Sequence, residues 1–271
     1  MLRVHLKYCL KSQEVVVCAS MLPVALKNHL MRRICEFEAT RISSNMGRKR
    51  KLNTAQVLDR IFFVCKTGCQ WSSLPVENAS FKTVYHYFAL WSRARLFEDV
   101  FDRCVREKQA RGGSLVIDTS FVKNVHGVDI LGKNPTDRGR RATKVSLLCN
   151  EWGTPLCAVF HQANKNDCLT LKHTLDTYER KVGQLSLYNS LLADKGYDSE
   201  TCRSVCKQRM LSPLIPRRRS SDVFHGRYVV EQTFGLLDQF RRVRVRYETL
   251  GRNFKSFHFL ALAVIVARRN R

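Results

Sequence analysis

Apolar residues recur at helical spacing from Thr54 to Val64, and Asn53 or Thr54 is placed to cap the start of this helix. Gly68 interrupts the pattern. A second helix is expected over residues 81–97, where Ser80 can supply the N-terminal cap.

A third helix is expected from Phe97 to Gln109. The helix, Gly-containing turn and helix before it resemble a helix-turn-helix unit, whose second helix enters the major groove of DNA. The residues taken as its DNA contacts are Lys82, Tyr85 and His86. A plain helical bundle fits as well, because one face of this helix is apolar, and the opposite face remains open to DNA. That apolar face is formed by Phe81, Val84, Phe88 and Trp91.

After Gly113 the pattern changes to that of strands. An apolar run from Leu115 stops at Asp118, which is expected to end the first strand. Residues 144–150 and 154–162 are two β-rich runs around a short turn and predict a hairpin. A fourth run, residues 185–194, ends at Asp194.

Helical and strand patterns alternate over the rest of the chain. The expected helices are 167–182, 199–210, 227–242 and 254–269, with a short strand at 211–216. The order predicts an α/β (α+β) fold in which helices flank a mixed sheet. The expected division is an unassigned extension (1–45), a helical, helix-turn-helix-like DNA-binding region (46–111) and a catalytic domain (112–271).

The charge balance points to a polyanionic partner. The 271 residues include 47 Lys and Arg against 23 Asp and Glu, a net charge of +24. Nucleic acid is the first candidate, because lysine and arginine contacts to phosphate release counterions. An anionic membrane surface would need an amphipathic helix with one basic face, which the apolar last helix does not offer. Neither a transmembrane run nor a secretory signal is expected.

The cysteines indicate a reducing compartment. There are 11, an odd number, and most lie among apolar neighbours. Cys65/Cys69 and Cys202/Cys206 are each spaced by one helical turn, but no paired histidines accompany them, so a structural zinc site is not favoured.

Three carboxylates stand at informative places. Asp118 and Asp194 end strands that can be neighbours in a mixed sheet, and Glu231 lies on a later helix that can pack across them. Glu231 directly follows Val229 and Val230, where a carboxylate is costly unless it is paired or bound to metal. Converging carboxylates repel each other and become stable when hard cations neutralise them.

Two such cations about 3.5–4 Å apart can activate water and stabilise the leaving oxygen of a phosphodiester. Basic residues near the acids would then hold the phosphate backbone. Those in loops are Arg138, Arg140, Arg141, Lys144, Lys195, Arg217, Arg218 and Arg219. The alternating segment 241–246 suits either phosphate contact or a solvated face.

Each acid alone also has a structural interpretation. Asp118 and Asp194 can cap turns, and Glu231 can pair with Arg227 one helical turn away. Three other acids, Asp129, Asp167 and Asp198, lie in loops or at helix starts, where capping explains them.

Three segments carry a family resemblance. LVIDTSFV, LLADKGYDSE and RYVVEQTFGLLDQFRR resemble, in this order, the three blocks of DDE insertion-sequence transposases, most closely the group named after insertion sequence five. The upstream TGCQWSSLP and TVYHYFALWSRARLFEDVF resemble the N-terminal helical region of that group. The resemblance covers residues 47–269, and residues 1–45 show no counterpart.

The resemblance implies an RNase H-like (retroviral-integrase-like) fold and Mg²⁺- or Mn²⁺-dependent DNA cleavage and strand transfer. Asp118, Asp194 and Glu231 would hold two metal ions. The implied partners are double-stranded DNA, as terminal inverted repeats and target, and further copies of the chain in a homodimer or higher oligomer. The implied location is the cytoplasm of a prokaryote or the nucleus of a eukaryote.

The last block departs from the family pattern at two positions. Arg227 and Glu231 match, but Phe224 replaces a tyrosine and Asp238 replaces a lysine expected to contact DNA. Arg241 and Arg242 lie within about a turn and can substitute for that lysine.

A transposase-derived DNA-binding protein without catalysis is the alternative function. Such a protein has no reason to keep all three acids, and this sequence has them. Because regular patterning begins after Met46, a chain starting there is expected to keep the catalytic fold.

Overall fold

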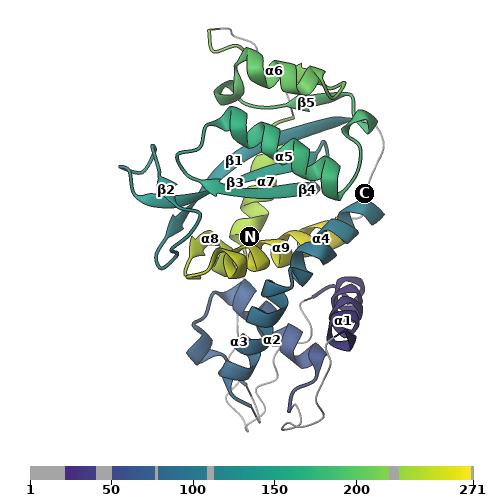
Figure 1. Cartoon of the computed structure of the whole chain (residues 1–271), viewed down its shortest axis with the longest axis vertical. Coiled ribbons are helices and arrows are strands. Elements are labelled where there is room, and N and C mark those ends of the chain that lie inside the picture. Colours follow the sequence, from purple (N-terminus) through teal and green to yellow (C-terminus); the bar gives the residue numbers. More distant parts are fainter. Residues whose placement is uncertain (1–21, 41–50, 77–78, 109–112, 220–225, 270–271) are drawn as a thin grey trace, which may run out of the picture.

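The computed structural model describes residues 22–40, 51–76, 79–108, 113–219 and 226–269. Met46 and Phe224 lie outside these ranges. The described residues form a mixed sheet with helices on its faces, and a group of helices lies beneath it (Figure 1).

The capping residues expected from the sequence begin two of the N-terminal helices. Asn53 forms a reciprocal capping box with Gln56 at the start of α2, and Gly68 ends that helix with a φ of 70°. Ser80 accepts a hydrogen bond from the Lys82 amide at the start of α3. The helices of this region are α1 (Val24–Ala39), α2 (Thr54–Thr67), α3 (Phe81–Arg93) and α4 (Leu96–Glu107).

Helix α1 was not expected. Its buried residues Leu26, Leu30 and Ile34 recur every fourth position, and the helix packs against α2, α4 and α9. The view that regular structure begins only after residue 46 is therefore wrong. These leucines and Ile34 belong to the same hydrophobic core as the rest of the chain.

The connection between α2 and α3 differs from a helix-turn-helix turn. It runs from Gly68 to Ser80 and contains a 3-10 turn at Trp71–Ser73, whereas the motif uses a turn of about 3–4 residues. Trp71 packs against Phe88 and Phe257, so the connection is part of the helical core. Lys82, Tyr85 and His86 nevertheless lie on the exposed face of α3.

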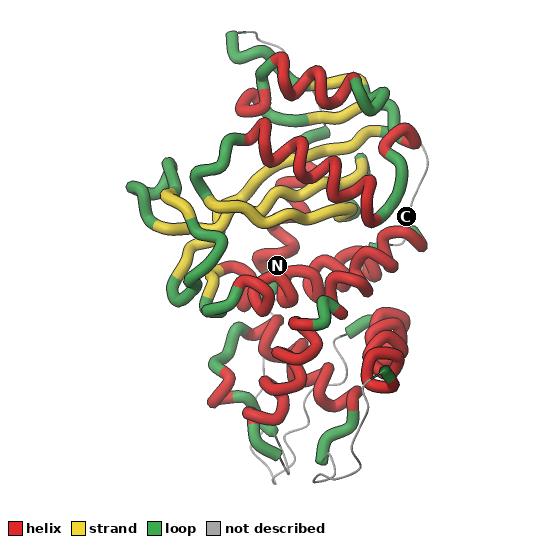
Figure 2. Tube along the Cα trace, in the orientation of Figure 1, coloured by secondary structure: helices red, strands yellow, loops and turns green. Residues whose placement is uncertain are grey.

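The sheet has the strand arrangement of the RNase H-like fold. β1 pairs antiparallel with β3, and β3 pairs antiparallel with β4, while β5 pairs parallel with β1 and β6 parallel with β5. The strands lie side by side in one layer (Figure 2). The long strands are β1 (Ser114–Asn124), β3 (Arg141–Asn150) and β4 (Pro155–Gln162). The short ones are β2 (Gly132–Lys133), β5 (Ser190–Leu192), β6 (Ser212–Leu214) and β7 (Val245–Arg246).

Two strand boundaries differ from the sequence-based expectation. β1 does not end at Asp118 but continues to Asn124, because its antiparallel pairing with β3 extends to Lys123. The fourth run yields only β5, since Leu185–Leu187 form a 3-10 turn instead. Asp118 therefore lies within a strand, two residues beyond the last β1–β5 pair, Val116 with Leu192.

Helices α5 (Asp167–Lys181) and α7 (Tyr228–Asp238) cover opposite faces of the sheet. The hydroxyl of Thr174 on α5 donates to Ser146 of β3. Asp118 pairs with Leu147, the residue after Ser146, so it points to the other face, on which α7 packs. The remaining helices are α6 (Glu200–Lys207), α8 (Arg241–Arg244) and α9 (Gly251–Arg268).

Helix α9 joins the sheet to the N-terminal helices. It contacts β4 and α7 on one side and α1 to α4 on the other, and most of its residues are buried. Lys108, just after α4, donates to the carbonyls of Val266 and Arg269 at the end of α9. No helix within the described ranges is long and apolar enough to cross a membrane. The described cysteines are free thiols, and most are buried.

Candidate active site

Asp118 occupies a partly buried position on the α7 face of β1. Its side chain is 19% exposed, and one oxygen accepts a hydrogen bond of 2.7 Å from the Thr119 amide. Burial raises the pKa of the Asp118 carboxyl to about 6, and the charges of Asp194 and Glu231 add to the rise. The Thr119 amide and Arg227 oppose it. Asp118 is thus a carboxyl whose surroundings favour an added cation or proton.

Asp194 follows β5 by two residues and caps the 3-10 turn at Lys195–Tyr197. Its Oδ1 accepts a hydrogen bond of 2.8 Å from the Gly196 amide. The parallel pairing of β1 with β5 ends at Val116 and Leu192, two residues before each acid, and the Asp194 charge contributes to the raised pKa of Asp118. The expectation that the two strands are neighbours is therefore met, although Asp194 itself lies beyond the end of β5.

Glu231 lies in the first turn of α7, and its side chain is 60% exposed. The free-energy cost of burial that was expected for this carboxylate does not arise, because the helix turns Val229 and Val230 inward and Glu231 outward. Glu231 Oε1 is 3.3 Å from Arg227 Nη2, and the same nitrogen is 3.9 Å from Asp118 Oδ2. Arg227 therefore lies between two of the three acids.

The donor set fits a hard divalent cation. Asp118, Asp194 and Glu231 offer only carboxylate oxygens, the ligands that Mg²⁺ prefers in proteins. In the described part of the chain, no group of three or more His, Cys, Asp or Glu side chains is close enough to hold one metal ion. Glu231 is directed to Arg227 in this structure, and the guanidinium supplies the positive charge between the acids.

Most of the predicted DNA contacts lie on the surface. The exposed ones outside α3 are Arg138, Arg140, Arg141, Lys195, Arg217, Arg218, Arg219 and Arg241. Arg227 is half-buried beside the acids. The exposed arginines remain predictions as DNA contacts.

Two of the predicted DNA contacts are buried instead. Lys144 is 4% exposed, with its ammonium 2.9 Å from Asp167 and 2.7 Å from the Lys165 carbonyl. Arg242 is 7% exposed and donates to Glu248 and to the Cys69 carbonyl. Neither side chain reaches the surface, so both assignments to phosphate contact are wrong, as is the suggestion that Arg242 replaces the missing lysine.

The segment 241–246 is split between the two interpretations left open for it. Arg241 and Arg244 are exposed, whereas Arg246 is completely buried and donates to the carbonyl of Asp129 and the hydroxyl of Thr143. Half of this basic segment therefore stabilises the fold.

The other acids are engaged in ion pairs. Asp129 binds Arg246 and accepts from the Gly251 amide. Asp198 binds Arg203 at 2.8 Å and accepts from the Arg218 amide. Asp167 binds Lys144, while the cap of α5 is supplied by Asn166 rather than by Asp167.

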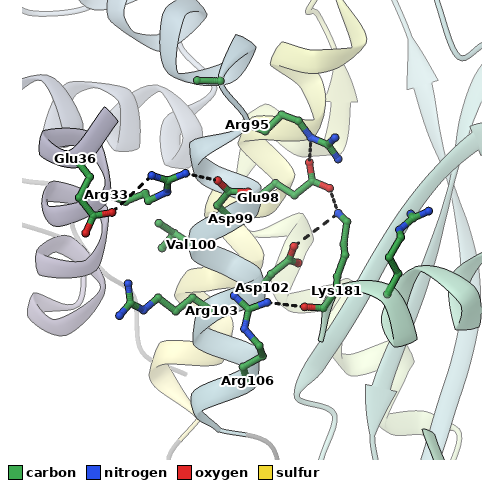
Figure 3. A pocket seen from close by; sticks show the side chains of 12 residues that line it. Arg33, Glu36, Arg95, Glu98, Asp99, Val100, Asp102, Arg103, Arg106 and Lys181 are labelled. Carbon is green, nitrogen blue, oxygen red and sulfur yellow. Dashed lines mark hydrogen bonds and ion pairs between the residues drawn. The ribbon is translucent and has the colours of Figure 1, made fainter. Parts of the chain in front are cut away.

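A charged groove between α1, α4 and the end of α5 was not foreseen (Figure 3). Its volume is about 590 Å³. Lys181 at the end of α5 contacts Glu98 and Asp102 of α4, and Arg33 of α1 lies 3.0 Å from Asp99. Glu98 and Asp102 are one helical turn apart in the sequence. This spacing could have indicated that a cation packs against the helix face they share, because like charges so placed repel each other.

Two family models match most of the chain. Residues 112–266 match "Transposase DDE domain", and residues 28–101 match "Putative transposase of IS4/5 family". The second match begins within α1, so the expectation that residues 1–45 lack a family counterpart is wrong from residue 28 onward.

A sequence relative is the "Putative transposase for insertion sequence element IS402" of Burkholderia cepacia. It is 38% identical over 127 residues, which are 43% of this chain and 59% of the relative, so the chain spans less than two thirds of that relative's length.

Similar solved structures include a piggyBac transposase synaptic complex with hairpin DNA and a Mos1 transposase catalytic domain with raltegravir and Mg. The first has a TM-score of 0.43 at 11% identity and covers 74% of this chain and 50% of that one. The second has a TM-score of 0.30 at 10% identity and covers 64% of this chain and 90% of that one. Scores this low add nothing to the fold assignment, which rests on the strand order. By its two family matches, the chain belongs to the DDE transposases of the IS4/5 family.

Proposed function

We propose that this chain is the transposase of an insertion element, and that it cleaves DNA at the terminal inverted repeats and transfers the strand to a target. The observation that carries the proposal is the position of Asp194 just beyond β5, the strand parallel to β1, close enough for its charge to act on Asp118, with Glu231 linked to Asp118 through Arg227. This arrangement occurs in a chain whose family match is to the DDE transposase domain.

Asp118, Asp194 and Glu231 would hold Mg²⁺ or Mn²⁺, with two ions expected. When bound, the ions would favour ionisation of an attacking water and neutralise the leaving oxygen of the phosphodiester. Asp118 would contribute a partly buried carboxylate from within β1, which is paired with β3 on both sides of this residue, so the ligand would be held by the sheet. Arg227 and Glu231 form an ion pair at the helix surface. Because Glu231 is exposed, replacing Arg227 by a metal ion would carry little desolvation cost for this carboxylate.

The DNA would be held by exposed basic side chains around the acids. Lys195 follows Asp194 directly, and Arg217–Arg219 follow β6, the strand next to β5. With a net charge of +24, affinity for duplex DNA is expected to fall steeply as salt rises. A homodimer or higher oligomer on DNA is part of the proposal, since an element has two ends.

The test is cleavage of a labelled duplex carrying one end of the element and its flank. Parent protein should nick this duplex with Mg²⁺ or Mn²⁺, should not nick it with EDTA, and should leave a scrambled end intact. Protein that binds the end specifically but does not cut it with either ion would instead establish the alternative, a retired DNA-binding protein.

A further inference from the structure

Asp194 lies beyond the hydrogen-bonded part of the sheet. The parallel ladder between β1 and β5 ends with Val116 and Leu192, and the Ala193 amide donates to Leu214 of β6. Asp194 then begins a 3-10 turn with its own side chain bonded to Gly196. The position of the Asp194 carboxylate relative to Asp118 therefore depends on what holds this turn.

The turn is seated on the N-terminal end of α5. Tyr197 is 1% exposed and is the apolar anchor of the turn, which contacts α5. Cys168 Sγ of α5 lies 2.9 Å from Ser199 Oγ, the cap of α6 just after the turn. Helix α5 thus reaches the Asp194 turn from the face of the sheet opposite to α7.

Asp167, the first residue of α5, approaches the Asp194 turn from that side. A Cβ atom placed on Gly196 would be 2.9 Å from Asp194 Oδ1 and 3.3 Å from Asp167 Oδ2. The two carboxylates therefore cannot be farther apart than the sum of these distances. Two negative charges at this separation repel each other unless a cation compensates one of them.

Lys144 supplies that cation from inside the fold. Its ammonium is 2.9 Å from Asp167 Oδ1, 2.7 Å from the Lys165 carbonyl and 5.2 Å from the centre of the Phe121 ring. Lys144 lies on β3 and pairs with Phe121 of β1, the strand that carries Asp118. A chain of contacts therefore runs from the strand of Asp118 through Lys144 and Asp167 to the turn of Asp194.

We propose that Lys144 and Asp167 are positioning residues, which together hold the Asp194 turn in register with Asp118. Lys144 fixes one oxygen of Asp167, and the fixed carboxylate in turn limits how closely the Gly196 turn approaches α5. The inference rests on the proposed metal site, because the geometry that the pair maintains is that of two metal ligands. Groups that hydrogen-bond directly to a metal ligand change metal affinity by about 10–100-fold when they are removed, and the low end of that range is expected for this indirect contact.

The experiment uses Lys144→Met, Asp167→Ala and Asp167→Asn, with Lys172→Met as the matched control. Lys172 is a half-exposed lysine on α5, and its ion-pair partner, Asp176, is not one of the proposed site residues. Asp167→Asn keeps an oxygen that can accept a hydrogen bond from Lys144 but loses the negative charge. It therefore separates the positioning of the turn from the electrostatic attraction of Mn²⁺ by Asp167. Mn²⁺ affinity is measured by isothermal titration calorimetry, without DNA and without turnover.

Lys144→Met and Asp167→Ala should weaken Mn²⁺ binding about 10-fold, while Asp167→Asn and Lys172→Met should bind within about 2-fold of the parent. An unchanged affinity in Lys144→Met and Asp167→Ala contradicts the proposal. Equal losses in Asp167→Asn and Asp167→Ala also contradict it, because they would make the charge of Asp167 the cause. If Lys144→Met does not fold, the two Asp167 variants decide, since that side chain is 33% exposed.

Hydrogen–deuterium exchange without metal is the second readout. The amides of Gly196, Tyr197 and Asp198 all donate within the turn and should exchange faster in Lys144→Met and Asp167→Ala. Those of β1 and β3 should not change, whereas a general loss of stability would accelerate both sets.

Asp118→Asn separates the two proposals. If it does not lower Mn²⁺ affinity, the metal site itself fails. If it does and the Lys144 and Asp167 variants match the parent, only the positioning role fails.

Discussion

The acids of the α1–α4–α5 groove and the acids at the sheet edge differ in how many cations pair with them. In the groove, Glu36 and Asp99 bind Arg33, and Lys181 binds both Glu98 and Asp102. Each acid there has a cation from its own chain. At the sheet edge, Arg227 is the cation that Asp118 and Glu231 share among the residues described.

Asp102 and Asp118 make the difference visible. Burial raises the pKa of each carboxyl to about 6. Neighbouring acids add to the rise at both carboxyls, but two cations, Lys181 and Arg106, oppose it at Asp102, whereas Arg227 is the cation that opposes it at Asp118. Paired acids connect helices, and acids left to share one arginine form a site that gains from an external cation.

Removing α1 should have the largest effect on the paired region. A chain that starts at Met46 loses Arg33 and three side chains that are 1% exposed, Leu26, Leu30 and Ile34. Each such deletion costs about 2–5 kcal/mol, and the sum approaches the whole stability of a typical domain of about 5–15 kcal/mol. The truncated chain should be unfolded or insoluble by circular dichroism, contrary to the expectation from patterning. A cooperative melt within a few degrees of the full chain would show that α1 is dispensable.

Substitution of Asp102 should stabilise the protein at neutral pH. Its pKa is about 6 in the folded protein against an ordinary 3.8, so the folded state binds the proton more tightly, and stability falls as pH rises through 6. Asp102→Asn removes this dependence. The gain in unfolding free energy should be about 3 kcal/mol at pH 7.5 and about 1 kcal/mol at pH 4.5, measured by urea unfolding.

Glu98→Gln is the matched opposite of that change. Burial alone would raise the pKa of Glu98, but hydrogen bonds from Arg95 and Lys181 outweigh it and lower the pKa. Stability from this group is therefore present at neutral pH and is lost on acidification. Glu98→Gln should cost about 1–2 kcal/mol at pH 7.5 and less at lower pH. If both variants shift stability in the same direction, the two carboxyls do not differ as described.

The larger features of the fold could be predicted because they depend on local signals. Asn53, Gly68 and Ser80 mark helix ends through their own side chains or backbone freedom. The hairpin and the alternation of strands and helices imply the mixed sheet, in which β1, the strand of Asp118, and β5, the strand that ends two residues before Asp194, are neighbours.

The roles of individual basic residues could not be predicted, since they depend on tertiary contacts that bury some of these side chains and leave others exposed. Lys144 looked like part of a basic loop, but β3 turns it under α5 to meet Asp167. Arg242 and Arg246 alternate with exposed arginines in the sequence. In the structure Arg242 forms an ion pair with Glu248, and Arg246 forms one with Asp129 of a distant loop. Helix α1 did carry a signal, the four-residue spacing of Leu26, Leu30 and Ile34, which the mixed polar pattern around it obscured.

The most direct test of the account is the rate at which Asp194→Asn nicks the element-end duplex with Mg²⁺, beside the parent and Glu200→Gln. Glu200 is an exposed acid six residues further on, so its substitution removes the same charge outside the site. Asp194→Asn should cut at least about 10³-fold more slowly while binding the duplex as the parent does, and Glu200→Gln should cut normally. If Asp194→Asn cuts as fast as the parent, Asp194 only caps its turn, and the shared acids at the sheet edge are not a catalytic site.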